Sequence, residues 1–396
     1  MKNKFLFLGI AAALFIACES DDTADIIIND NSVINNNNGE EPDPNVTAVN
    51  LSGVFTEDLT LDPNIEYTIT GPVLMADGTT LTIPAGMTVR AQPVGVNAYI
   101  AIQQGAQINA MGTASEPIVL TSNASNPSSG DWGGLVICGR APINSTADGS
   151  TDTATSEVGG LSYGGNTPTD NSGILQYVRI EFAGGAIDGN AELNGLSAYA
   201  VGSGTTIDFV QVYEGSDDGF EFFGGTVNAS HLVVVNSEDD SIDWTEGFTG
   251  NLTDVYVQHG TSHDKAFECD GYNTDFSNAS GAFSAPNVTN VTVIGANDAS
   301  EAIRLRAGTQ GLFNNVVITD FDEAFDLDGD AGDNPTGQGV IDGLLNVTDV
   351  TFNNVTTRLR NDTGFTFTEA DFIFGEGNGT GTDIATWGAG WTVGIN

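Results

Sequence analysis

From residue 48 onward, short apolar segments alternate with polar turns in a repeating pattern. A β-branched segment such as residues 207–212 leads to an acidic and apolar segment such as residues 217–225, and the pair then recurs. Within each segment apolar and polar positions alternate with a period of two, which predicts strands. The first apolar residues of successive second segments, at spacings of 24, 22, 25, 36 and 22 residues, are Leu196, Phe220, Ile242, Phe267, Ile303 and Phe325.

A repeat of this length predicts stacked structural units. No helical run of 10–12 residues separates the strands, which excludes βαβ units. One coil of a parallel β-helix needs about this many residues, and its coils stack at ~4.8 Å, the normal strand spacing. We therefore predict an all-β fold, a single-stranded parallel β-helix (a solenoid), over residues 48–396. The spacing of 36 predicts a loop at residues 273–286 that leaves the stack intact.

The N-terminus reads as a lipoprotein signal. Residues 1–4 form a short basic segment with two lysines, residues 5–17 form an uncharged apolar stretch, and Cys18 follows directly. A cysteine placed after such a stretch is typical of a bacterial lipoprotein, whose thiol is acylated. Acyl chains contribute about 0.8 kcal/mol per buried CH₂, so several chains hold a protein on a membrane durably. We expect residues 1–17 to be removed and the mature chain to bind the lipid membrane through palmitate-type acylation of Cys18.

Residues 18–47 are expected to be a flexible tether. The stretch is rich in Asp, Asn and Pro and carries too few apolar residues to fold. Its start, Glu-Ser-Asp-Asp at residues 19–22, resembles the acidic export signal of Bacteroidetes lipoproteins. That resemblance implies a position on the outer membrane that faces the cell exterior.

The excess of acidic residues limits the classes of ligand that the protein can bind. The chain holds 53 acidic and 10 basic residues, a net charge of −43, which becomes −45 (−43 − 2) once Lys2 and Lys4 leave with the signal. Nucleic acid is therefore excluded as a partner, because affinity for polyphosphate comes from Lys and Arg. Cations are natural partners. Cys138 and Cys269 lie in apolar strand-like segments and are expected to be buried free thiols.

Acidic residues recur at the start of the second strand of successive coils. Stacking brings their like charges close together, which is unfavourable unless a cation lies between them or their pKa values rise. Calcium prefers six to eight oxygen ligands and is the one cofactor expected. The alternative is a set of acid-rich turns that bond their own backbone. The candidate calcium ligands are Asp217, Asp218, Glu221, Asp239, Asp240, Asp243, Asp326, Asp328 and Asp330.

A hydrolytic site is a second interpretation of the same acids. Asp218 and Asp240, one coil apart, are followed by His259 and Arg304, an order similar to that of polygalacturonase-type glycoside hydrolases. The Gly-His-Gly signature of those enzymes is absent, an Asn-Thr-Asp occurs only at residues 273–275, after His259, and Arg306 stands in place of their lysine. A lyase would need a basic proton abstractor, for which Lys265, Arg179 and Arg304 are the candidates.

Aromatic residues offer a binding interpretation instead. They either line a sugar-binding face or pack in the core and turns, and core packing is favoured for most of them. These residues are Trp132, Tyr163, Tyr199, Tyr213, Trp244, Tyr256 and Tyr272.

Several segments carry a family resemblance. Residues 110–113, 130–135, 159–165, 217–225 and 387–392 resemble a family of Bacteroidetes surface lipoproteins. The resemblance implies a right-handed parallel β-helix and brings no catalytic residue set with it. Members are sometimes labelled transporters, but no segment after residue 17 is apolar and long enough to span a bilayer.

Together these patterns predict a lipid-anchored binding protein. The expected role is non-enzymatic binding of glycan or another extracellular ligand, as an accessory to an outer-membrane uptake complex or to adhesion. The alternative is a polysaccharide-degrading enzyme, and a purely structural role is the third option.

Overall fold

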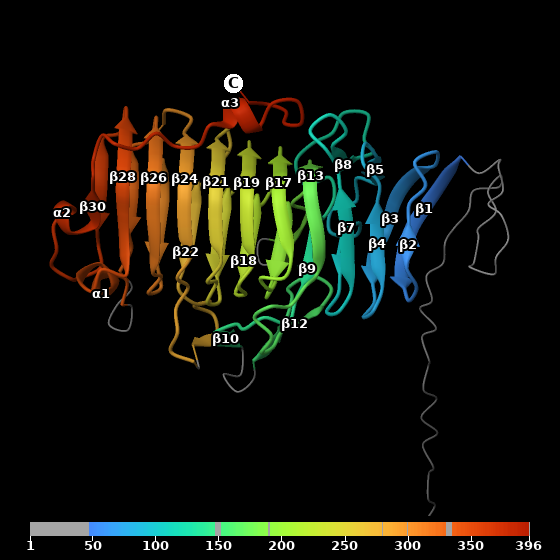
Figure 1. The fold of residues 1–396 in the computed structure, drawn as a ribbon, viewed down its shortest axis with the longest axis horizontal. Helices are drawn as coiled ribbons and strands as arrows, with labels where there is room; N and C mark the ends of the chain where they lie inside the picture. The colour runs from blue at the N-terminus through green and yellow to red at the C-terminus, as the bar shows by residue number, and fades with distance from the viewer. Residues whose placement is uncertain are drawn as a thin grey trace, which may run out of the picture.

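The computed structural model describes residues 47–146, 152–188, 191–278, 280–298, 300–329 and 335–395. The predicted signal segment and the tether up to residue 46 lie outside the described residues. These residues form an all-β parallel β-helix, as predicted. Its coils stack from β1 at one end to β28 and β30 at the other (Figure 1). No helix among the described residues is both long and apolar enough to cross a bilayer.

The first coils are built from the long strands β1 and β3 and from six shorter strands. Their ladders are parallel and join the later coils where β7 and β8 both pair with β13. They are β1 (Ala48–Phe55), β2 (Leu59–Thr60), β3 (Glu66–Met75), β4 (Thr80–Ile83), β5 (Thr88–Ala91), β6 (Ile100–Ile102), β7 (Gln107–Met111) and β8 (Ile118–Ser122).

The later coils each combine one long and one short strand. The long strands are β13 (Gly173–Glu181), β17 (Thr206–Tyr213), β19 (Asn228–Val235), β21 (Asn251–Gln258), β24 (Asn287–Ile294), β26 (Gly311–Thr319) and β28 (Leu345–Asn353). The short strands are β9 (Leu135–Cys138), β16 (Leu196–Tyr199), β18 (Phe220–Phe223), β20 (Ile242–Thr245), β22 (Phe267–Asp270), β25 (Glu301–Arg306), β27 (Glu323–Leu327) and β29 (Thr357–Asn361).

The remaining elements are small. Three antiparallel pairs stand outside the stack: β10 (Ser145–Thr146) with β23 (Ser277–Asn278), β11 (Thr153–Thr155) with β12 (Ser162–Gly164), and β14 (Ala186–Asp188) with β15 (Ala191–Glu192). The C-terminal part holds α1 (Thr336–Ile341), α2 (Glu369–Phe372), β30 (Ile373–Phe374) and α3 (Ile384–Trp387). The loop that carries β23 falls within the predicted insertion at residues 273–286, and the coils on either side of it stay in register.

Each long strand bends at one central residue with a positive φ. These residues lie at matching positions in successive coils and are Tyr177, Phe209, His231, Asp254, Asn290, Asn315 and Asp349. A positive φ is uncommon for residues with a Cβ, and Asn and Asp tolerate it best. The bend divides each long strand into two halves, so each coil presents three outward faces, one from the short strand and two from the long strand.

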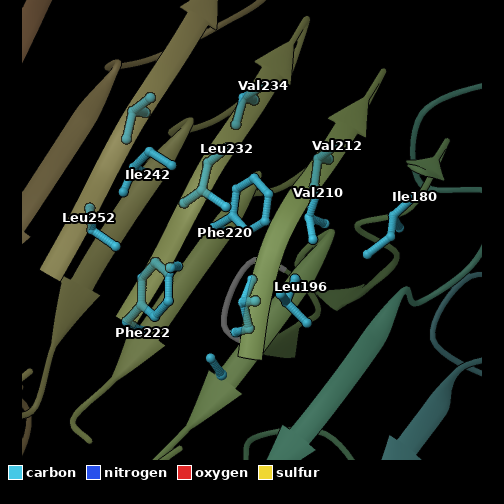
Figure 2. Packing of buried hydrophobic residues seen from close by; sticks show 14 of the residues in the cluster. Ile180, Leu196, Val210, Val212, Phe220, Phe222, Leu232, Val234, Ile242 and Leu252 are labelled. Atoms are coloured by element: carbon cyan, nitrogen blue, oxygen red, sulfur yellow. The ribbon is translucent and has the colours of Figure 1, made fainter. Parts of the chain in front are cut away.

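The interior is filled by the alternate side chains of both strands. The predicted anchor residues form one continuous register, Leu196 to Phe220 to Ile242 to Phe267 to Ile303 to Phe325, which confirms the repeat. Opposite them, inward residues of the long strands such as Val210 and Leu232 complete the core (Figure 2). Cys138 and Cys269 are buried and unpaired, as expected.

Residues 375–395, which we call the C-terminal strap, run back over the C-terminal halves of the long strands (Figure 1). Trp391 is fully buried there against Val233, Val235 and Tyr256. The strap is held by side chains of the coils, since Gln211 donates to the Val393 carbonyl at 2.7 Å and accepts from its amide at 2.9 Å. This closing segment therefore covers one of the three faces.

Candidate functional site

The outward face of the short strands, which we call the charged face, collects the acidic residues singled out in the sequence. One row of this face runs through paired positions of successive strands and consists of Glu221, Asp243, Glu268, Arg304, Asp326 and Arg360. Neighbours in the row are one strand spacing apart, ~4.8 Å. Like charges directly opposite one another destabilise a sheet, and opposite charges stabilise it.

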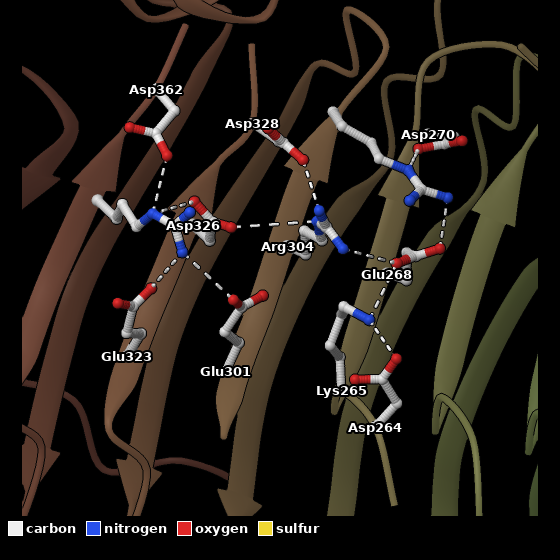
Figure 3. Close-up of polar contacts among 12 residues, drawn as sticks. Asp264, Lys265, Glu268, Asp270, Glu301, Arg304, Glu323, Asp326, Asp328 and Asp362 are labelled. Atoms are coloured by element: carbon white, nitrogen blue, oxygen red, sulfur yellow. Dashed lines mark hydrogen bonds and ion pairs between the residues drawn. The ribbon is translucent and has the colours of Figure 1, made fainter. Parts of the chain in front are cut away.

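The C-terminal half of the charged face alternates in sign (Figure 3). Arg304 donates to Asp328 at 2.6 Å and lies 3.8 Å from Glu268 and 4.0 Å from Asp326. On the other side of Asp326, Arg360 Nε lies 3.7 Å from its carboxylate. The candidate metal ligands Asp326 and Asp328 therefore already have cationic partners, and Asp330 lies outside the described residues.

The N-terminal half of the charged face has no such alternation. Carboxylate oxygens there lie within 4.8 Å of one another in four groups, namely Asp217 with Asp218 and Asp239, Asp218 with Glu221 and Asp243, Asp239 with Asp240 and Asp264, and Asp240 with Asp243 and Glu268. Lys265 lies against the last two groups, 3.9 Å from Asp240 and 3.2 Å from Glu268. Asp243 belongs to two of the groups. In this row the first cationic neighbours are on the far side of Glu268. The structure thus brings the first six candidate calcium ligands together and places Asp326 and Asp328 farther along the face.

Burial changes the protonation of these acids. Burial, together with the nearby carboxylates of Glu192 and Asp239, raises the pKa of Asp217 to about 8. The pKa values of Asp218, Glu221, Asp240 and Asp243 are also raised well above the ordinary range, first by burial and then by the neighbouring acids. At neutral pH this half of the face is therefore under electrostatic strain that protons or a bound cation relieve.

The donor set fits a hard divalent cation. Every ligand atom is a carboxylate oxygen, the type that calcium binds at ~2.3–2.6 Å. Asp243 Oδ1 is buried and accepts no hydrogen bond within the described residues. Asp326 Oδ1 also accepts none, but Arg360 compensates it. Glu268 already forms ion pairs with Lys265, Arg304 and Arg306. The residues that would hold a cation are therefore Asp218, Glu221 and Asp243, with Asn194 donating to Glu221 at 2.7 Å.

The four candidate catalytic residues occupy different surroundings. Asp218 and Asp240 are only 7% and 4% exposed. Asp218 accepts the backbone amide of Asp240 at 3.1 Å, and Asp240 accepts that of Lys265 at 2.7 Å, so both carboxylates tie one coil to the next. Such bonds are the alternative role considered for these acids.

His259 and Arg304 line separate hollows. His259 borders one with Tyr213 and Glu238, whereas Arg304 borders another with His263 and Asp298. The His259 ring stacks on His263 at 4.3 Å, and burial together with that neighbour lowers its pKa to about 3. His259 is therefore a neutral, packed side chain in this structure.

The candidate proton abstractors are held as cations. Lys265 lies 3.2 Å from Glu268 and 3.9 Å from Asp240, and these carboxylates, with Asp264, raise its pKa against the opposing effect of burial. Asp328 and Glu268 likewise raise the pKa of Arg304. A base must be neutral to accept a proton, so the arrangement disfavours lyase chemistry.

Most of the aromatic candidates pack inside the protein, as favoured from the sequence. Trp132, Tyr163, Tyr199, Trp244 and Tyr256 are buried, which leaves Tyr213 and Tyr272 partly exposed. No aromatic sugar platform is formed by these seven residues.

Sequence reasoning missed the acidic residues that loops bring to the charged face. Glu157 and Glu192 come from the loops carrying β11, β12 and β15, and both raise the pKa of Asp217. The sequence missed Glu246 as well, which is fully buried and accepts from Tyr163 at 2.9 Å and Asn273 at 3.3 Å. Burial raises its pKa to about 7. No repeat or motif marks these residues, because each depends on loop packing.

Comparisons with known proteins agree with the fold. A family model described as a pectate-lyase-like β-helix domain matches residues 53–392. The chain is similar to the catalytic unit of a thermostable GH87 α-1,3-glucanase from Streptomyces thermodiastaticus strain HF3-3, at 11% identity and a TM-score of 0.38, with 82% of this chain and 65% of that chain covered. No curated protein sequence matches it.

A second similar structure is the catalytic domain of a GH87 α-1,3-glucanase in complex with nigerose, at 11% identity and a TM-score of 0.32. The match covers 81% of this chain and 64% of that chain. The chain therefore spans just under two thirds of the length of both solved structures.

Replacing an aspartate with asparagine should change Tm in opposite directions in the two halves of the charged face. Without divalent cations, Asp243→Asn should raise Tm by ~2 °C or more, because it removes a carboxyl group whose ionisation burial and the neighbouring acids disfavour. A change of about 1 kcal/mol corresponds to that shift. Asp326→Asn, the matched control, should lower Tm because Arg304 and Arg360 lose the carboxylate between them. Thermal melting in chelator measures both, and a shift of the same sign in both variants would contradict the distinction.

The raised pKa values predict a pH dependence. The folded protein binds more protons than the unfolded chain between the unfolded carboxyl values, about 4, and the folded values, so these groups stabilise it at low pH. Their contribution is lost as the pH rises toward about 8, the folded value for Asp217. In chelator, Asp217→Asn should therefore flatten the fall of Tm between about pH 4 and pH 8. If the dependence of Tm on pH is the same in Asp217→Asn as in the wild type, the raised pKa of Asp217 is refuted.

Proposed function

The chain belongs to the family of pectate-lyase-like β-helix domains, and from this premise we propose that it is a non-enzymatic, lipid-anchored surface protein that binds an extracellular acidic glycan at its charged face through a divalent cation. The unpaired N-terminal half of that face carries the proposal. Two overlapping carboxylate groups there, Asp217 with Asp218 and Asp239 and Asp218 with Glu221 and Asp243, form no ion pair within the described residues. Farther along the same row, Lys265 and the arginines neutralise the acids.

A cation supplies two things at such a site. It neutralises the buried carboxylates, and its remaining coordination positions accept oxygen atoms from a ligand. The chain itself carries a net charge of −43 and would otherwise repel a polyanion. The protein supplies the ligands: Asp218, Glu221 and Asp243 offer carboxylate oxygens, and Asn194 orients Glu221.

Two features support binding over catalysis. Lys265 and Arg304 are held in ion pairs that keep them protonated, so neither accepts a proton from a substrate. Asp218 and Asp240 are nearly buried and bonded to the backbone of the next coil. Both observations describe residues that hold the structure together.

Polysaccharide hydrolysis is the second candidate function, and one observation favours it. Asp217 is only partly buried and its pKa is raised to about 8, which is suitable for a general acid at neutral pH. Product analysis in the binding experiment below distinguishes this alternative.

The proposed function predicts that calcium both binds and stabilises the protein. After chelation, calorimetric titration should detect binding and thermal melting should show an upward shift of Tm, since a ligand that binds only the folded state stabilises it. Polygalacturonate should then bind in calcium and not in chelator, without release of reducing ends. Asp243→Asn should lose both effects and Asp326→Asn should keep them. Release of oligosaccharides would favour the enzyme, and absence of any calcium effect would refute the proposal.

The membrane position rests on the N-terminal sequence and has its own test. In the expressing bacterium, Cys18→Ala should abolish incorporation of labelled palmitate and release the protein from the outer-membrane fraction. Protease added to intact cells should degrade the wild-type domain if it faces the exterior, as the acidic start of the tether at residues 19–22 suggests. Retention of the label in Cys18→Ala would contradict acylation at this residue.

A further inference from the structure

A second outward face is flat, polar and uncharged. It comprises the N-terminal halves of the long strands from β19 to β28, and we call it the neutral strip. Its first column consists of Asn228, Asn251, Asn287, Leu312 and Asn346. Its second column consists of Ser230, Thr253, Thr289, Asn314 and Thr348.

The strip has a regular geometry. Positions in one column repeat at the strand spacing of ~4.8 Å, so five rows extend over about 19 Å along the axis of the β-helix. The two columns are about 7 Å apart, because they are two residues apart on each strand. In Figure 1 these strands lie side by side and in parallel.

Hydrogen bonds between neighbouring asparagines order part of the neutral strip before any ligand binds. Asn251 Nδ2 donates to Asn228 Oδ1, and Asn287 Nδ2 donates to Asn251 Oδ1 at 3.0 Å, while all three side chains stay exposed. Side chains ordered before binding lose less conformational entropy on binding. Beside them, the hydroxyls of Thr253 and Thr289 make no hydrogen bond within the described residues. The strip thus presents fixed amides and open hydroxyls.

The strip differs from both other faces. From β18 to β29 the short-strand face is charged, and the C-terminal halves of the long strands carry apolar residues such as Val233 and Tyr256 that the C-terminal strap covers. Across the five strands of the strip, in contrast, no position of either column is charged, on a chain with 53 acidic residues. Among the described residues, no segment packs over the exposed asparagines.

We propose that the neutral strip binds a neutral polysaccharide chain that lies along the axis of the β-helix. Amide and hydroxyl groups both donate and accept hydrogen bonds, as sugar hydroxyls do. The absence of charge matches an uncharged ligand, and the repeat along the axis matches a polymer with repeating hydroxyls. This site is separate from the charged face and does not depend on a cation.

The composition of the strip argues against a protein partner. Protein interfaces rely on aromatic, Met and Arg anchors, with an apolar centre. The neutral strip has one apolar side chain, Leu312, at 43% exposure, and no aromatic residue or arginine. Sugar recognition by many small polar groups needs no such anchor.

The test uses the purified protein in chelator, where the charged face is inactive by the proposal above. Binding to cellulose and chitin particles and to soluble mixed-linkage β-glucan is measured by co-sedimentation and affinity electrophoresis. We expect at least one of these probes to bind. The double variant Thr253→Val and Thr289→Val should raise Kd at least tenfold, since valine keeps the β-branched shape and removes the hydroxyl.

The control variant is Thr68→Val, a half-buried threonine of β3 outside the strip, which should bind as the wild type does. Tm and circular dichroism should be unchanged in all variants, and polygalacturonate binding in calcium should survive the double variant. The proposal is overturned if none of the three polysaccharides binds, if the double variant binds as tightly as the wild type, or if chelation abolishes the binding. It is also overturned if sedimentation shows a dimer that the double variant dissolves.

Discussion

The register between successive coils is the constraint on which the rest of this structure depends. Each strand pairs in parallel with the equivalent strand one coil away, so every residue faces its own structural counterpart at the strand spacing. A favourable contact such as Phe220 over Ile242 is repeated along the stack, and so is an unfavourable one. Rows of apolar residues therefore build the core. In each outward row, the side chains of neighbouring coils must tolerate one another's charge and size.

The row from Glu221 to Arg360 shows both solutions to this constraint. In its C-terminal half, arginines alternate with acids and each charge has a partner of opposite sign. In its N-terminal half, Glu221, Asp243 and Glu268 succeed one another and their electrostatic strain persists. The protein thus shows that this position accepts arginine, which makes the unpaired acids a feature that stability alone does not explain. A ligand that supplies positive charge accounts for them.

The bend in the long strands gives the β-helix three outward faces, and the same constraint on neighbouring residues applies to each face. Because each long strand turns at a residue such as His231 or Asn290, its two halves point in different directions and take on different chemistry. One half carries apolar residues such as Val233 and Tyr256, which the strap covers with Trp391. The other half is neutral, polar and open, and the short strands are charged. One repeat thereby carries three surfaces along a single axis.

The sequence alone determined the strands, their parallel stacking and the register of the anchors from Leu196 to Phe325, because these follow from local alternation and from a repeat that recurs every few tens of residues. It also identified the stacked acids. Only the tertiary structure decided which acids are paired, that His259 and Arg304 lie in separate hollows, and that the loops carrying Glu157 and Glu192 reach the charged face. Those contacts join positions far apart in the chain, and no periodic pattern records how a loop or a terminal strap folds back onto the coils.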